Sequence, residues 1–278
     1  MPVNPAIGGI GTKTTKLFSH FDPRKRVRGR YPVGNGFSGR TNVLAMDIFE
    51  LSADAVDQAA ALNPLMATYA GISGYDDAWP DLSPAGHAAT RAFYTDLLAK
   101  ALECETPDDR HQLAQRVLVE DCNLHIAHHD ANSHHYDVNN IVSPHQEVRM
   151  VFASMPDQTT DDWEAICRRI ETIDQVMGGY QATLEEGRAA GNVVSKRQVA
   201  AVIEQGTFAA GPESSFHALA QKLIDSPVDT NLFESRLAEA IDAAKAVFAD
   251  FNVFLESYLP DAAEHDGVGE QRLSLIHI

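Results

Sequence analysis

A repeated helix-start signal, Ser or Thr followed directly by Pro, constrains the fold of this chain more than any other feature. It occurs at Ser83-Pro84, Thr106-Pro107 and Ser143-Pro144. A hydroxyl at the N-cap accepts a hydrogen bond from a backbone N–H that would otherwise be unpaired, and Pro fits the first turn because no N–H is needed there. These signals predict helices over residues 84–103 and 107–129, and a shorter helix after Ser143.

A continuous apolar stripe follows Thr160. Its members recur at steps of three and four positions, as on one face of a helix: Trp163, Ile166, Ile170, Ile173, Met177, Tyr180 and Leu184. Asp161 and Asp162 fall in the first turn, where carboxylates are favoured by the helix dipole. The pattern predicts one long helix capped by Thr160, in which Gly178-Gly179 either introduces a kink or admits a close neighbour.

Three further segments complete the helical pattern. Ser195 begins one helix, residues 213–225 form a short one, and residues 230–258 form the last, which ends before Pro260. The last segment has a predicted core face made of Leu232, Phe233, Leu237, Ile241, Ala244, Phe248, Phe251 and Leu255. Alternating apolar and polar runs, which are typical of strands, are scarce. We therefore expect an all-α fold, an irregular bundle of roughly seven to nine helices after residue 46.

The charge changes sign at residue 46. Residues 1–45 hold eight of the 22 Lys and Arg residues and one of the 39 acidic residues, so this segment carries +7 whereas the remainder carries −24. A basic arm that binds an anionic surface, a disordered leader, and upstream DNA translated in frame are three interpretations of this segment. We favour the third, with Met46 as the true start, because charge, glycine content and periodicity all change there.

Composition excludes several classes of protein. The net charge of −17 argues against a nucleic-acid partner, which normally requires a basic face. No apolar run approaches the roughly 18 residues that a membrane span requires, and no secretory signal is visible. Cys104, Cys122 and Cys167 are odd in number and widely spaced, which indicates buried thiols in a reducing compartment. These observations predict a cytoplasmic protein without nucleic-acid or membrane partners.

Six of the twelve histidines fall within 21 residues, and they form the most conspicuous chemical cluster. On a helix, His125 and His129 share one face, the spacing with which two imidazoles bind one zinc ion, and Glu120, Asp121 and Asp130 are near enough to complete a ligand set. The alternative, which we favour, is a solvated helix end whose histidines lie near the negative end of the helix dipole. We therefore assign no metal ligand, with His125 and His129 as the weaker alternative, and no catalytic residue.

The middle of the chain resembles a bacterial family. The stretch DVNNIVSPHQEVRMVFASMP at 137–156 precedes DDWEAICRRI at 161–170, GGYQATLEEGRAAGNVVSKRQV at 178–199 and a helix that ends with YLPDAAEHDGVGEQR at 258–272. Together these motifs, in this order, resemble the DUF885 family (domain of unknown function 885) from about Phe49 to Arg272. The resemblance implies a mostly helical fold and a relationship to zinc metallopeptidases.

Proteins of that family are about twice as long as the matching part, and the resemblance places their zinc motif, of the type HE-x-x-P-G-H-H, in the C-terminal half. The last six residues, LSLIHI at 273–278, match the translation of a transposon-end sequencing adaptor. We therefore interpret residues 46–272 as the N-terminal helical half of a longer protein. The resemblance implies an inactive fragment without a cofactor, from a parent that requires zinc and hydrolyses short peptides, with a non-catalytic scaffold or binding module as the alternative.

The resemblance also suggests which residues line a cleft against the missing half. Asn139 and Asn140 carry amides that can hold a peptide backbone, and Arg197 and Gln198 resemble a carboxylate clamp. The alternatives are stronger: the asparagines cap and turn the chain between two helices, and Arg197 forms an ion pair on a helix surface. The implied partners are the C-terminal half of the same protein and short peptides.

Overall fold

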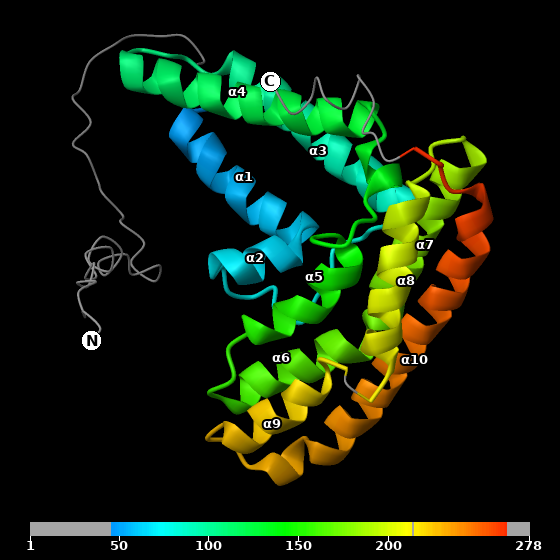
Figure 1. Cartoon of the computed structure of the whole chain (residues 1–278). Coiled ribbons are helices and arrows are strands. Elements are labelled where there is room, and N and C mark those ends of the chain that lie inside the picture. Colours follow the sequence, from blue (N-terminus) through cyan, green and yellow to red (C-terminus); the bar gives the residue numbers. More distant parts are fainter. Residues whose placement is uncertain (1–45, 213, 266–278) are drawn as a thin grey trace, which may run out of the picture. The chain divides into compact units, whose positions relative to one another are not determined.

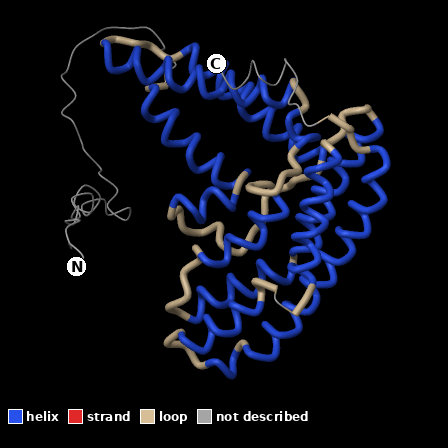
Figure 2. Tube along the Cα trace, viewed as in Figure 1, coloured by secondary structure: helices blue, strands red, loops and turns tan. Residues whose placement is uncertain are grey.

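Helices account for every regular element of the described residues, which are 46–212 and 214–265 of a computed structural model. In chain order the α-helices are α1 (Ile48–Leu62), α2 (Pro64–Ala70), α3 (Pro84–Glu103), α4 (Asp109–Asp130), α5 (Pro144–Met150), α6 (Thr160–Glu171), α7 (Ile173–Ala189), α8 (Lys196–Ala210), α9 (His217–Asp225) and α10 (Glu234–Tyr258). Four 3₁₀ turns join them, η1 (Ser133–Tyr136), η2 (Val151–Ala153), η3 (Thr230–Leu232) and η4 (Leu259–Asp261). The predicted all-α fold is confirmed (Figures 1 and 2).

The described residues thus form ten α-helices rather than seven to nine. Two of them, α1 and α2, occupy a stretch for which no boundaries were predicted, and the predicted helix after Thr160 is divided in two. None of the helices in the described ranges is both long and apolar enough to cross a membrane. The predicted segments 1–45 and 273–278 lie outside the described residues.

The three helix-start signals place two helices well and one less well. Ser83 caps α3, because its side chain accepts a hydrogen bond from the N–H of Gly86, and α5 begins directly after Ser143. The start predicted at Thr106-Pro107 is wrong by two residues: Asp108 is the N-cap of α4, and its carboxylate accepts from the N–H of His111 at 2.9 Å. Asp and Thr are both good N-caps, so the signal at Thr106 does not by itself determine where the helix begins.

The predicted long helix ends at Thr172 and a new one begins there. Thr159, not Thr160, caps α6 through a capping box with Asp162. At Thr172 the hydroxyl donates to the carbonyl of Arg168 at 3.0 Å and the backbone leaves the helical region, so α6 and α7 are separate. The apolar stripe is nevertheless buried along its whole length, which confirms its role in the core. Gly179 admits the close neighbour that was predicted, since a Cβ there would lie 3.0 Å from the backbone N of Ser83.

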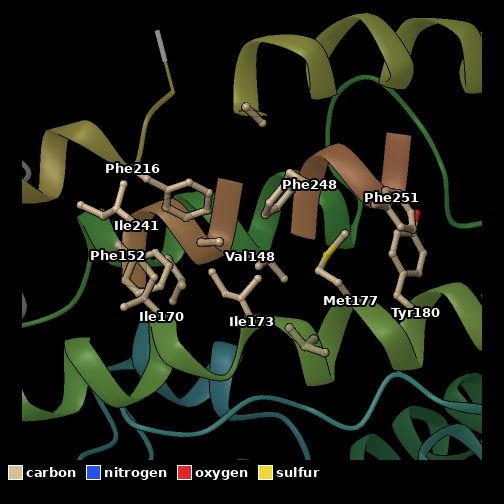
Figure 3. Close-up of a cluster of buried hydrophobic side chains, with 14 of the residues drawn as sticks. Val148, Phe152, Ile170, Ile173, Met177, Tyr180, Phe216, Ile241, Phe248 and Phe251 are labelled. Carbon is tan, nitrogen blue, oxygen red and sulfur yellow. The ribbon is translucent and has the colours of Figure 1, made fainter. Parts of the chain in front are cut away.

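The larger of two hydrophobic cores is built around α10. Its face is buried as predicted except at Leu232, which lies in η3 before the helix begins and is 60% exposed. The ring of Phe248 lies 5.5 Å from that of Phe216, and Phe251 stacks on Tyr180 at 5.1 Å. Side chains of α5, α6, α7 and α10 meet in this cluster (Figure 3). The predicted helix over 213–225 begins only at His217, because a turn precedes it.

The smaller core joins α1, α3 and α4, and it determines how the histidines of α4 are placed. Its buried members are Ile48, Leu51, Ala55, Leu97, Ala101, Cys104 and Cys122. All three cysteines of the chain are buried and form no disulfide, which confirms the prediction of buried thiols. Because this core holds α3 against α4, polar residues on the facing sides of these two helices are brought together.

Arg169 joins α6 to α2 and to the loop that follows α2. Its guanidinium is fully buried and donates to the carbonyls of Ala78 at 2.8 Å and Tyr75 at 3.1 Å, and to the hydroxyl of Thr68 at 2.9 Å. The indole of Trp79 lies 5.2 Å from the cation and donates to the carbonyl of Arg169 at 2.7 Å. Burial lowers the pKa of Arg169 to about 10, so the group stays charged at neutral pH.

Candidate functional site

A pocket of about 150 Å³ lies between α3 and α4 and is lined largely by imidazole rings. We call it the histidine pocket. The pairing of α3 and α4 explains it, because a connection of five residues, 104–108, brings the polar face of one helix against the His-rich end of the other. Its lining residues are His87, Thr90, Arg91, Tyr94, His125, His128, His129, Ser133 and His134.

One side of the pocket is closed by stacking and an ion pair. The rings of Tyr94 and His125 are nearly parallel, with centroids 3.8 Å apart, and Arg91 Nε lies 2.7 Å from Asp130 Oδ1. Burial lowers the pKa of His125, against the opposing effect of Asp121, and raises the pKa of Tyr94 to about 12. Both rings are therefore neutral at pH 7.

His134 is the centre of the imidazole cluster. Its ring centroid lies 4.5 Å from that of His87, 4.9 Å from His129 and 4.4 Å from His135. Burial, together with the neighbouring imidazoles, lowers the pKa of His134 to about 3. The ring is thus neutral at physiological pH and keeps a nitrogen lone pair for a ligand.

Beside the pocket, η1 meets α7. His135 Nε2 lies 3.3 Å from Glu186 Oε2, and His135 Nδ1 lies 3.2 Å from the side-chain amide of Asn192, which accepts from the hydroxyl of Tyr136. Gly187 permits this approach, because a Cβ at that position would lie 2.8 Å from the Cβ of His135. Within the described ranges, the group of potential metal ligands whose donor atoms lie within 4.8 Å of one another is His134, His135 and Glu186.

The two predicted metal ligands, His125 and His129, line the same pocket but lie outside that group. His125 stacks on Tyr94, whereas His129 lies beside His134. The pairing of His125 with His129 on one ion therefore stays a prediction. Sequence reasoning missed His87 and Glu186, which come from α3 and α7. The sequence does contain one signal for α3, since His87, Thr90, Arg91 and Tyr94 recur at the spacing of one helix face.

Three of the four predicted cleft residues, Asn139, Asn140 and Gln198, lie in an amide cluster that also contains Gln146 and Gln205. Asn139 Oδ1 accepts from the backbone N–H groups of Ile141 and Val142 at 2.9 and 2.7 Å. Across the loop, Gln198 Oε1 accepts from the N–H of Asn140, and the Gln205 amide donates to the Asn140 carbonyl. The amides thus hold the chain's own turn, the alternative favoured above.

Arg197 lies on the exposed side of the first turn of α8, next to Gln198. Whether any of the four predicted residues, Asn139, Asn140, Arg197 and Gln198, contacts a substrate stays a prediction.

His145 is a second unusual histidine. Its side chain in α5 is fully buried against the rings of Phe248 and Phe251, and among the described residues neither ring nitrogen has a hydrogen-bond partner. Burial lowers the pKa of His145 to about 3, and the cation of Arg149 contributes in the same direction. The ring therefore acts as an aromatic filler in the neutral form.

We expect acid to destabilise the protein through His145. The pKa is about 6.5 in an unfolded chain and about 3 in the fold, so the unfolded state binds more protons between these values. Stability therefore falls as the pH drops below 6.5, by about 2 kcal/mol at pH 5 for this residue. Urea unfolding at pH 7 and pH 5 should show a correspondingly smaller loss for His145→Phe. An equal loss in both proteins would contradict this, and His217→Gln, at an exposed position, is the control.

Two solved structures share this fold. The chain aligns with "the putative lipoprotein from Colwellia psychrerythraea" at a TM-score of 0.67 and 15% identity, over 82% of this chain and 44% of that one. For "a putative lipoprotein of unknown function from Shewanella oneidensis" the TM-score is 0.62 and the identity 16%, over 78% and 38%. At such identities the likeness shows the fold alone. The chain spans less than half the length of either protein.

No curated protein matches the sequence. The model of a family described as "Bacterial protein of unknown function (DUF885)" matches residues 64–274, so it begins 15 residues after Phe49 and ends two residues after Arg272, the bounds of the segment that carries the sequence motifs. The chain belongs to the DUF885 family.

Proposed function

We propose that this chain is the N-terminal, non-catalytic half of a longer protein that resembles a zinc-dependent peptidase acting on short peptides. The observation that supports this most is coverage: the alignment takes in 82% of this chain but only 44% of the first similar structure. The sequence contains no His-Glu dipeptide and therefore no motif of the type HE-x-x-P-G-H-H. We assign the zinc and the catalytic groups to the rest of the parent, and no hydrolytic step to residues of this chain.

The loop at the amide cluster is the surface that we propose for contact with the other half. Ile141 is 79% exposed and Val142 is 54% exposed, although both are large and apolar. The side chains of Asn139 and Gln198 accept hydrogen bonds from the backbone of this loop, and Gln205 donates one to it, so Ile141 and Val142 are presented on a fixed support. Exposed apolar groups on a fixed support are typical of a surface that packs against a partner.

We expect the isolated chain to bind an apolar dye such as ANS through this loop. The double variant Ile141→Ser/Val142→Ser should bind no more than about half as much dye as the wild type, since two large exposed side chains are removed. The matched control is Leu113→Ser/Val117→Ser, which removes two exposed apolar side chains from one face of α4. A wild-type monomer that binds no dye, or a loss of dye binding only in the α4 variant, would contradict the proposed contact.

The source DNA tests the proposal as a whole. Sequencing past the codon for Arg272 should reveal a reading frame that continues into an HE-x-x-P-G-H-H helix. A native gene that stops near this codon, or that continues without those ligands, would overturn the peptidase assignment.

A helical scaffold or binding module is the second candidate. It is favoured by the amide cluster, whose hydrogen bonds are made to the chain's own backbone and to one another. For a scaffold or binding module, we expect a reading frame without the zinc motif and a full-length parent that hydrolyses no peptide.

We also propose the cytoplasm as the compartment, without nucleic-acid or membrane partners, because three free buried thiols fit a reducing environment. The descriptions of the two similar structures as lipoproteins favour the cell envelope instead. Fractionation of cells that express the full-length parent distinguishes the two, since a lipid-anchored protein sediments with the membranes.

A further inference from the structure

Three metal-ligating side chains converge where η1 meets α7. The donor atoms of His134, His135 and Glu186 lie within 4.8 Å of one another, although Glu186 is 51 residues from His135 in the sequence. On a tetrahedral zinc ion with bonds of about 2.0–2.2 Å, neighbouring donor atoms lie roughly 3.4 Å apart. Small rotations of the three side chains would bring their donor atoms from within 4.8 Å of one another to the separation that a zinc ion requires. Two imidazoles and one carboxylate are a ligand set that zinc uses in proteins.

The surroundings of His134 are hard to explain as packing alone. Its ring lies within 5 Å of three other imidazoles, those of His87, His129 and His135. The ring of His134 is half-buried and lines the histidine pocket, and its nitrogens are not among the fully buried atoms, so they are accessible to a ligand. A bound cation would use such a nitrogen, and the adjacent histidine pocket gives it access and a further potential ligand in His87 or His129.

Each ring nitrogen of His135 has its own polar neighbour. One ring nitrogen faces Glu186, and the other faces the side-chain amide of Asn192, which Tyr136 holds in turn. With His135 Nε2 on a metal, Nδ1–H would donate to the Asn192 oxygen after a rotation of the amide. Such a contact orients the ring and selects the tautomer that binds.

We propose that His134, His135 and Glu186 form a binding site for a divalent transition-metal ion of the zinc type. The proposal does not depend on peptidase activity. The simpler alternative is an ordinary contact between His135 and Glu186. It explains why these two side chains are close together, but it does not explain why His134 lies beside them.

Titration of the purified full chain with zinc, after treatment with a chelator, tests the site. Calorimetry should show one saturable site with a Kd below about 10 µM, and cobalt should give the visible absorption of a low-symmetry nitrogen and oxygen site. His134→Ala and Glu186→Gln should each weaken binding by more than about tenfold. Glu186→Gln is the safer variant for folding, because this side chain is 52% exposed and the amide keeps its shape.

Two controls make the result specific. His217→Ala changes an exposed histidine on α9 and should leave the affinity unchanged. His125→Ala removes the ring stacked on Tyr94 and should also leave it unchanged. Absence of a saturable site, wild-type affinity in both His134→Ala and Glu186→Gln, or a loss that follows His125 instead would each overturn the proposal. A zinc-dependent rise in melting temperature, present in the wild type and reduced in Glu186→Gln, is the second measurement.

Discussion

Replacement of Arg169 by Ala should lower the free energy of unfolding by about 3–5 kcal/mol. The buried guanidinium donates to two backbone carbonyls of the loop after α2, at Tyr75 and Ala78, and to the hydroxyl of Thr68. The part-buried carbonyl of Ala78 would lose the guanidinium as its donor, the carbonyl of Tyr75 would keep the N–H of Ala78 at 3.3 Å, and the indole of Trp79 would lose its cation. Arg169→Lys should recover little, because an ammonium group cannot reproduce the planar fork of donors. Urea denaturation followed by circular dichroism measures the change.

The adjacent Arg168 is a matched control. Its side chain is exposed and forms ion pairs with Glu164 at 3.1 Å and Asp77 at 3.4 Å. Such pairs contribute little in water, so Arg168→Ala should change the stability by less than about 1 kcal/mol. Similar losses in the two variants would show that burial does not determine the role of Arg169.

Gly187→Ala should lower the stability by about 1–3 kcal/mol and should also displace the imidazole cluster. A Cβ at this position would lie 2.8 Å from the Cβ of His135 and 2.9 Å from the carbonyl oxygen of Asn192. Neither atom is the free end of a flexible side chain, so η1 must move away from α7. Because His135 is one of the three ligands of the proposed metal site, the variant should also bind zinc more weakly, and the same titration measures this.

Gly178→Ala, on the same helix, serves as the control. No atom lies within 4 Å of the position that its Cβ would take, and the residue is exposed. Because Ala has a higher helix propensity than Gly, this variant should be stabilised by up to about 1 kcal/mol. A loss of stability of equal size at both glycines would indicate that helix α7 itself, not the contact with η1, is sensitive to substitution.

Local chemistry in the sequence accounts for much of the fold. Ser83 caps α3, and the apolar positions of the last helix, from Leu237 to Leu255, are buried as their spacing predicts. The errors lie at positions where two local signals compete. Asp108 replaces Thr106 as a cap, and the Thr172 hydroxyl ends α6 inside an unbroken apolar stripe. Apolar spacing reports which face is buried, but it does not report a change of axis between two helices that share one face.

The candidate site could be predicted only in part. Proximity in the sequence indicated a histidine cluster at the end of α4, and the structure places His125 and His129 in one pocket. His87 and Glu186 could not be assigned to it, because they come from α3 and α7, and the pairing of those helices with α4 and η1 depends on contacts distant in the sequence. The amide cluster shows the same limit, since Gln198 and Gln205 reach Asn140 across 58 and 65 residues.

The all-α class, most helix starts, the apolar faces and the family motifs are encoded locally, because caps, turns and helix periodicity act over a few residues. The meeting of two histidines with Glu186, the need for glycine at position 187 and the burial of Arg169 among backbone carbonyls depend on the tertiary packing. Those outcomes follow from the packing of helices against one another, where atoms from distant segments compete for the same space and the same hydrogen bonds.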